Sequence, residues 1–176
     1  MDLASGITSF IDGLVHFLEV SASDPLSFTV IFLIYAILAA IILPIPVEIG
    51  LFFSPETPLL VKVLIMGLGK MIGAIIVYYI GLTVGDQLRM WSSRFRVFNW
   101  IVNKCEWLVN KFHYVGLYII LSTPLMTDTV PLYLFSVFNE KGVFTMKWFA
   151  LVSFMGGMTR GLIVFAIFSL LGVKLI

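Results

Sequence analysis

The stretch Pro44-Ile45-Pro46-Val47-Glu48 lies inside an apolar run that extends from residue 26 to residue 53. Two prolines cannot continue a helical hydrogen-bond ladder, so the chain has to bend or unwind there. Inside a bilayer, freed backbone groups and an ionisable side chain are tolerated only where protein or a water-filled cavity surrounds them. The stretch therefore predicts a broken segment at membrane depth, with Glu48 facing inward as part of a transport site.

The composition of the whole chain is that of an integral membrane protein. Of the 176 residues, 60% are hydrophobic and 12% are charged, whereas soluble domains are about 45–50% apolar and about 25% charged. The runs are continuously apolar rather than alternating, so the spans are expected to be helices and not barrel strands. The single cysteine, Cys105, excludes an internal disulfide, and no Cys/His cluster has metal-ligand spacing, so we expect no metal or other cofactor.

The apolar runs divide the chain into four parts, and the expected fold class is an all-α integral membrane protein. Residues 1–24 predict an amphipathic helix on the membrane surface, and residues 86–113 predict a basic amphipathic linker helix at the interface. Residues 25–85 and 114–176 each predict a re-entrant helical hairpin followed by a transmembrane helix. The alternative for the first hairpin is that residues 26–43 form an ordinary crossing.

The two crossing helices are expected from Leu59 to about Leu82 and from Trp148 to Leu171. Each is long enough, at roughly 1.5 Å per residue, to cross a hydrocarbon core of about 30 Å. Basic residues concentrate on the cytoplasmic side of membrane proteins, so we expect residues 86–113 in the cytoplasm and the acidic N-terminal segment outside. The expected location is the cell membrane, with the first hairpin entering it from outside and the second from the cytoplasm.

A second carboxylate, Asp128, lies between helix breakers in the later apolar run. Each acidic loop is followed by a helix that carries one cation beside glycines, Lys70 in the first and Arg160 in the second. The chain therefore reads as two copies of one unit in opposite orientations, an arrangement whose substrate site usually lies near the midplane. The candidate substrate- or proton-binding residues are Glu48, Asp128, Arg160, Lys70, Pro44, Pro46, Pro124 and Thr127.

Two further patterns predict how the helices pack and where their ends lie. The glycines at 69, 73, 81 and 85 are spaced at multiples of four, which favours close approach of a neighbouring helix backbone. Lys62 and Lys147 lie near helix starts, where we expect both side chains to snorkel to the membrane surface.

The first repeat resembles the DedA family, also called the VTT-domain or SNARE-associated Golgi protein superfamily. The resemblance is carried by Pro44-Ile-Pro46-Val-Glu48, a following apolar run, Gly67-Leu-Gly69-Lys70-Met-Ile-Gly73-Ala, and Tyr78-Tyr79-Ile80-Gly81 to Gly85. It extends more weakly through the second hairpin and covers roughly residues 40–172. It implies two re-entrant hairpins that face each other and a role in moving lipids across the bilayer. Bacterial members are implicated in returning polyprenyl-phosphate carrier, with dependence on the proton motive force, and eukaryotic relatives scramble phospholipids.

The second hairpin departs from the pattern of many bacterial members, which carry two arginines around its proline. Leu121 and Thr127 stand about where those arginines would fall, and Asp128 resembles the acidic variant of other branches. The loop therefore lacks the phosphate-binding cations that the resemblance implies. Lys70 and Arg160 are the candidates to replace them, provided that they reach the cavity.

The charges at membrane depth suggest a mechanism. Each ionisable residue at a helix centre costs about 2.5–3.5 kcal/mol, so four of them imply pairing or contact with water. Our hypothesis is that Glu48 and Asp128 exchange a proton or a salt-bridge partner when a lipid headgroup enters between the hairpins. Lys70 and Arg160 would hold the phosphate, with Arg160 as the better bidentate donor. In the alternative, Glu48–Arg160 and Asp128–Lys70 pairs only lock the two repeats together.

Three classes of function fit these features. The first is a DedA-type flippase or scramblase for phospholipid or polyprenyl phosphate. The second is a proton-coupled antiporter for a small cation or drug, and the third is a membrane scaffold that transports nothing. Membrane lipids are the expected partners, with protons and a second copy of the chain as further candidates and no nucleic acid. No intramembrane-protease motif and no G-x-S-x-G is present, so we do not expect an enzyme.

Overall fold

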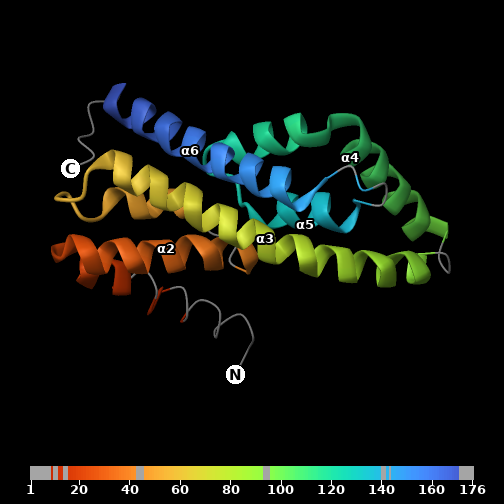
Figure 1. The fold of residues 1–176 in the computed structure, drawn as a ribbon, viewed down its shortest axis with the longest axis horizontal. Coiled ribbons are helices and arrows are strands. Elements are labelled where there is room, and N and C mark those ends of the chain that lie inside the picture. The colour runs from red at the N-terminus through yellow and green to blue at the C-terminus, as the bar shows by residue number, and fades with distance from the viewer. Residues whose placement is uncertain are drawn as a thin grey trace.

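The computed structural model is a bundle of helices (Figure 1). It describes residues 9, 12–13, 16–42, 46–92, 96–139, 142 and 144–170, and the side chains among them except those of 86–106, 108 and 110. Within these ranges every regular element is a helix, which confirms the predicted helical class. The elements are η1 (Ser21–Ser23), α2 (Pro25–Ile41), η2 (Val47–Phe52), α3 (Leu59–Ser92), α4 (Arg96–Ser122), α5 (Thr129–Val137) and α6 (Met146–Leu170), where η denotes a 3-10 helix.

Helices α3 and α6 are the two long apolar helices and lie side by side in opposite directions (Figure 1). Gly161 near the end of α6 packs against Val63 near the start of α3. The hydroxyl of Tyr79, later in α3, lies 3.1 Å from the sulfur of Met146 at the start of α6. The stretches long and apolar enough to cross a membrane are Leu59–Gly85 and Met146–Leu170. These bounds match the predicted spans to within a few residues.

The first hairpin consists of α2 and a short return. Phe28 near the start of α2 lies over the ammonium of Lys62 in the first turn of α3, and Ala40 packs against Gly73. Early residues of α2 contact early residues of α3, and later residues contact later ones. The two helices are therefore parallel, and α2 ends beside the middle of α3. The return limb η2 lies back beside the start of α3, where the carbonyl oxygen of Leu51 accepts a hydrogen bond from Lys62 (Figure 1).

The returning limb is the 3-10 helix η2 and not an α-helix. Only seven residues separate Pro46 from the polar loop that begins at Ser54. A 3-10 helix rises about 2.0 Å per residue against about 1.5 Å for an α-helix, so the short limb reaches farther in this form. Glu48 lies in its first turn.

The second hairpin approaches α3 from the other end of the bundle (Figure 1). Helix α4 has a kink at His113 (φ 46°, ψ −145°), and the part after the kink runs to Ser122. Residues 123–128 are not helical, and the nine residues of α5 form the return. The predicted break in the second apolar run is therefore present.

At four glycines of α3, the helices of the two hairpins pack closely against the α3 backbone. A Cβ atom at Gly69 or Gly73 would lie 2.4 or 2.5 Å from an alanine Cβ of α2, and one at Gly85 would lie 2.5 Å from a carbonyl oxygen of α5. A Cβ atom at Gly81 would lie 2.0 Å from the hydroxyl of Ser136 in α5. The predicted close approach at these glycines is confirmed, and α3 holds one hairpin on each half of its length.

Some predictions fall largely outside the described residues. These include half of the N-terminal stretch 1–24, the side chains of most of the basic stretch 86–113, and Pro44. Residues 16–20 are helical, and Asp24 caps α2 by accepting hydrogen bonds from the amides of Leu26 and Ser27. The hydroxyl of Ser27, and then its amide, hold the pKa of the Asp24 carboxyl below its ordinary value.

Gly73→Ala tests the close packing of α2 on α3. The added Cβ would meet the Cβ of Ala40 at 2.5 Å and the carbonyl oxygen of Ile37 at 3.1 Å. We expect the free energy of unfolding in detergent micelles to fall by about 1–3 kcal/mol, although alanine is the better helix former. Gly13→Ala is the control, because no atom lies within 4 Å of its added Cβ. An equal effect at both positions would contradict the packing.

Candidate functional site

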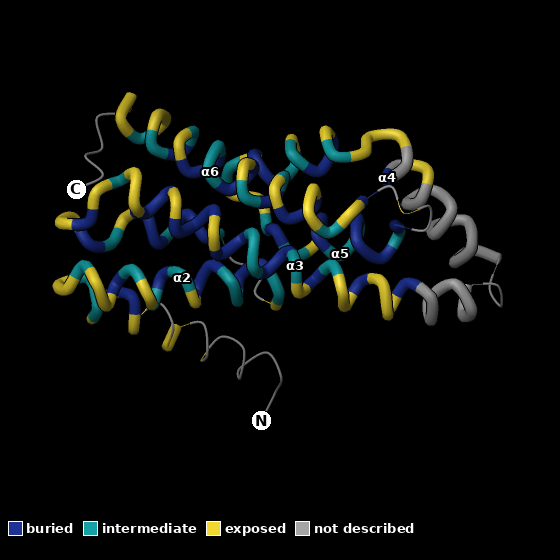
Figure 2. Tube along the Cα trace, in the orientation of Figure 1, coloured by how far each residue is buried: buried dark blue, intermediate teal, exposed yellow. Residues whose placement is uncertain are grey.

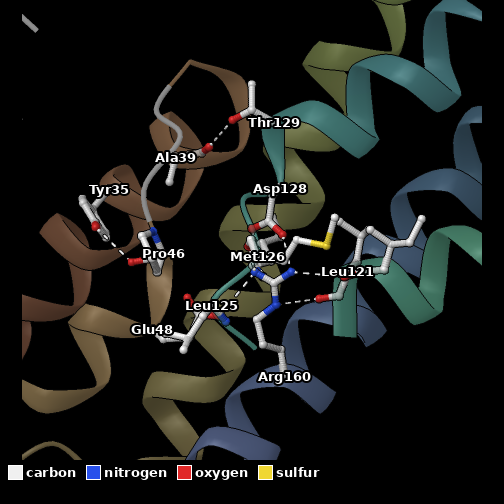
Figure 3. A network of polar contacts seen from close by, with 12 residues as sticks. Tyr35, Ala39, Pro46, Glu48, Leu121, Leu125, Met126, Asp128, Thr129 and Arg160 are labelled. Atoms are coloured by element: carbon white, nitrogen blue, oxygen red, sulfur yellow. Dashed lines mark hydrogen bonds and ion pairs between the residues drawn. The ribbon is translucent and has the colours of Figure 1, made fainter. Parts of the chain in front are cut away.

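The tips of the two hairpins meet beside α3 and bond directly to each other (Figure 3). Thr129, at the start of α5, donates its hydroxyl to the carbonyl oxygen of Ala39 near the end of α2, at 3.0 Å. The amide of Leu125, in the second loop, donates to Oε1 of Glu48 at 3.3 Å. Each hairpin tip thus forms a hydrogen bond with a group from the other hairpin.

Four ionisable side chains from distant parts of the chain meet between these tips. Nζ of Lys70 lies 2.9 Å from Oδ2 of Asp128, and Nη2 of Arg160 lies 2.9 Å from Oδ1 of the same carboxylate. Nη1 of Arg160 lies 3.3 Å from Oε1 of Glu48. The contacts form an ion-pair chain in the order Glu48–Arg160–Asp128–Lys70.

The ion-pair chain is enclosed by protein. The exposed fractions of its four side chains are 2, 0, 2 and 1% in the order given above. Two carboxylates and two cations make it neutral when all four groups are ionised. Buried charges are stable only when they are paired and hydrogen-bonded, because several kcal/mol per ion, in order of magnitude, are lost on leaving water. The neutral chain meets the first part of that requirement, because each charge has an opposite charge within 3.3 Å.

Arg160 uses its whole guanidinium group within the site (Figure 3). In addition to the two carboxylates, it donates to the carbonyl oxygens of Leu121 (Nε, 2.7 Å), Met126 (Nη1, 2.7 Å) and Ile120 (Nη2, 3.5 Å). An arginine side chain has five N–H donors, one on Nε and two on each Nη. Each of its three nitrogens therefore donates to a backbone carbonyl, and the two Nη atoms also lie within ion-pair distance of the carboxylates.

The position of Arg160 is explained by the end of α4. The last four carbonyl groups of an α-helix have no partner within the helix, and the negative end of the helix dipole lies there. α4 ends at Ser122, so the carbonyls of Ile120 and Leu121 are among those four. A buried helix end needs a donor from elsewhere in the protein. The amide of Thr123 donates to the carbonyl of Ile120 at 3.2 Å, and Arg160 supplies the donor for Leu121 from α6.

Three members of the ion-pair chain have buried atoms that make no hydrogen bond to the described residues: Lys70, Glu48 and Asp128, both of whose carboxylate oxygens are in this group. Among the described residues, Nζ of Lys70 contacts a single acceptor, Oδ2 of Asp128, although an ammonium has three N–H donors. Oε2 of Glu48 is buried and also has no hydrogen-bond partner among the residues that the structure describes. Hydrogen-bonding capacity is therefore left unused at Lys70, at Glu48 and at Asp128.

The remaining predicted site residues are less central. Pro46 is half-buried, and its carbonyl oxygen accepts a hydrogen bond of 3.3 Å from the hydroxyl of Tyr35. Pro124 and Thr127 are half-buried in the second loop. Tyr35 is not among the predicted residues, although a tyrosine hydroxyl in the middle of the apolar helix α2 is a signal for a polar contact at depth.

The predicted position of Lys62 at the membrane surface is wrong. Its side chain is 3% exposed, and Nζ donates to the carbonyl oxygen of Leu51 at 3.2 Å. The ring of Phe28 lies 5.9 Å from the ammonium, on the path that a snorkelling side chain would take. Lys62 therefore donates to a backbone carbonyl of the return limb η2 and does not reach outward. Lys147 is exposed, as expected.

Arg160→Lys tests whether the guanidinium holds the second break together. Lysine keeps the positive charge but has three donors on one atom, so several buried oxygens lose their donor. At about 1–3 kcal/mol for each unsatisfied group, we expect the free energy of unfolding in detergent micelles to fall by about 3 kcal/mol or more.

The control is the reverse exchange on the exposed side of the same helix. Lys147→Arg should change the free energy of unfolding by less than about 0.5 kcal/mol, as is usual for surface positions. A similarly small effect of Arg160→Lys would show that the carbonyl contacts do not stabilise the fold.

Comparison with known proteins does not identify the function of the chain. No protein-family model, curated protein or solved structure matches the chain. The function is therefore inferred from the buried charges, from the placement of the two hairpins and from the resemblance in the sequence.

Proposed function

We propose that the chain is an integral membrane protein whose two spans are α3 and α6. The pattern of exposure supports this, because both helices have exposed positions along their length (Figure 2), many of them large apolar residues, while the cations Lys62, Lys70 and Arg160 are buried. Exposed apolar residues of the two helices include Leu60, Leu64, Leu68, Ile76, Ile80, Leu82, Leu151, Met155, Leu162 and Ile167. A soluble monomer rarely exposes contiguous apolar surface on this scale, whereas a bilayer favours it.

The proposed topology is an inverted repeat of a hairpin followed by a span. The α2–η2 hairpin lies along the first half of α3, and the hairpin formed by α4 and α5 lies along the second half (Figure 1). With α3 crossing the membrane, the two hairpins would enter from opposite leaflets, and their bonded tips would lie at depth. The polar loop around Glu56 would then face outside and the basic stretch 86–113 the cytoplasm.

The function that the geometry supports best is movement of a lipid phosphate across the bilayer by a DedA-type flippase or scramblase. The observation that carries it is the buried ion-pair chain at the meeting point of two broken helices. Four charges at such depth are expensive and in membranes usually mark a substrate or ion path. Cations beside broken helices suit a phosphate, and phospholipid or polyprenyl phosphate is the substrate class of the family that the sequence resembles.

Proton coupling is suggested by the charge balance of the site. The ion-pair chain is neutral, so a bound phosphate monoanion adds one uncompensated negative charge. Uptake of one proton by Glu48 or Asp128 would restore neutrality, and the free oxygen Oε2 of Glu48 can carry that proton. We propose that the headgroup and one proton occupy the site together.

A second candidate is a membrane scaffold that transports nothing. It is favoured by the pairing of all four charges and by the hydrogen bonds of Arg160 to three backbone carbonyls. The two candidates predict different effects of removing the carboxylate charges, because a scaffold has no transport rate to lose.

Cysteine labelling tests the proposed topology. In a Cys105→Ser background, Glu56→Cys and Lys111→Cys each place one thiol at an exposed position. A membrane-impermeant maleimide added to intact cells should label the first and spare the second, and inverted vesicles should give the reverse. Labelling of both thiols from one side would rule out a crossing by α3.

Glu48→Gln and Asp128→Asn test the transport mechanism. In proteoliposomes with fluorescent phospholipid or prenyl phosphate, we expect each variant to translocate lipid at least about tenfold more slowly, because loss of one charge-assisted contact has about this effect. Glu56→Gln, in the exposed loop, should keep the wild-type rate.

The controls are the thermal unfolding temperature and the wild-type rate itself. Wild-type rates in folded Glu48→Gln and Asp128→Asn would contradict the proton-relay idea. Absence of translocation by the wild-type protein with every lipid tested would favour the scaffold.

A further inference from the structure

The two cations of the site are held in different ways, and this difference divides their roles. We propose that Lys70 is the residue that contacts the phosphate, and that Arg160 is a positioning residue that holds the break between α4 and α5. This inference rests on the proposed function and reverses the order of preference that residue chemistry alone indicates, in which arginine is the better phosphate ligand.

Arg160 cannot turn toward a substrate without leaving buried oxygens unsatisfied. Its Nε and Nη1 atoms each donate to a carbonyl oxygen at 2.7 Å, and those carbonyls belong to the end of α4 and to the second loop. A phosphate would have to replace these contacts, and the freed carbonyls have no other donor among the described residues. The arginine therefore serves the fold of the loop.

Lys70 can change partner at little cost. Its ammonium contacts one oxygen of Asp128, and the other oxygen of that carboxylate is already paired with Arg160. When Lys70 moves to a phosphate, Asp128 therefore keeps a partner, and no acid is left alone. The two remaining N–H donors of the ammonium can bind phosphate oxygens even before that contact breaks.

The space beside Lys70 is provided by glycine. A Cβ atom at Gly157 of α6 would lie 2.8 Å from Cδ of Lys70, so the lysine side chain passes through a slot where α6 has no side chain. The stem of Lys70 fills this slot and carries an ammonium with one ion-pair partner, whereas each nitrogen of the planar Arg160 guanidinium donates to a carbonyl.

The test compares affinity for a short prenyl monophosphate with affinity for the prenyl alcohol of the same length. The protein is purified in detergent, and the ratio of the two dissociation constants isolates the phosphate from the apolar tail. In the wild-type protein we expect the phosphate to bind at least about tenfold more tightly. Lys70→Met should bring the ratio close to one.

Two variants keep the test independent of folding. Lys70→Met with Asp128→Asn removes one opposite pair, so the cluster stays neutral, and this double variant should also have a ratio close to one. Lys62→Met is the matched control, because Lys62 is a buried lysine on the same helix whose Nζ contacts a backbone carbonyl. It should keep the wild-type ratio.

Arg160→Lys should keep the phosphate preference while its thermal unfolding temperature falls. A folded double variant that still prefers the phosphate, or a lost preference in Arg160→Lys together with a retained one in Lys70→Met, would overturn the assignment to Lys70. If the wild-type protein does not distinguish phosphate from alcohol, the proposed function fails instead. The two failures are thus separate results.

Discussion

The structure depends on how the backbone groups freed by two broken helices find partners away from water. A helix that ends inside an apolar bundle leaves up to four carbonyls without donors, and each costs several kcal/mol in hydrocarbon if it stays unpaired. Here the donors come from far along the chain. Arg160 serves the end of α4, Thr129 serves the end of α2, and Lys62 serves the return limb η2. The freed carbonyls of each hairpin therefore have donors only when the other elements are in place. The two broken helices thus depend on the tertiary fold.

The same constraint explains why α3 lies at the centre. Its glycines let α2 approach the first half and α5 the second half at backbone range, which brings both tips to the level of Lys70. Side chains at those positions would push the hairpins outward and lengthen every contact of the cluster. The glycine spacing and the charges thus act on one feature, the depth and separation of the two tips.

The sequence predicts the outline of this arrangement because its signals are local. Two prolines before Glu48 require a break, a run of apolar residues requires a helix, and glycines at multiples of four predict close packing. These features are present in the structure. The pairing of Glu48 with Arg160 and of Lys70 with Asp128 is predicted only as the alternative to substrate binding, and the contact between Arg160 and Asp128 is not predicted.

The features that the sequence does not predict are those set by tertiary placement. Lys62 is near a helix start, where a lysine usually reaches water, but Phe28 of another helix covers it. Arg160 is recognisable as a buried cation, yet nothing local says that it will bind Leu121 and Met126 carbonyls. Leu125 adopts a positive φ of 61°, uncommon for leucine, and its amide donates to Glu48, a contact that exists only once both tips have met.

The order of contacts along the ion-pair chain bears on which function it serves. Two isolated pairs would be enough to lock two hairpins, and replacing them with apolar residues would often be as stable. The observed chain instead links Glu48 to Lys70 through Arg160 and Asp128, so Arg160, which also donates to three backbone carbonyls, joins the acids of the two hairpins. The terminal acid has an oxygen and the terminal cation has donors without an internal partner. A proton and a phosphate could then bind at opposite ends, while the pair between them keeps both tips in place.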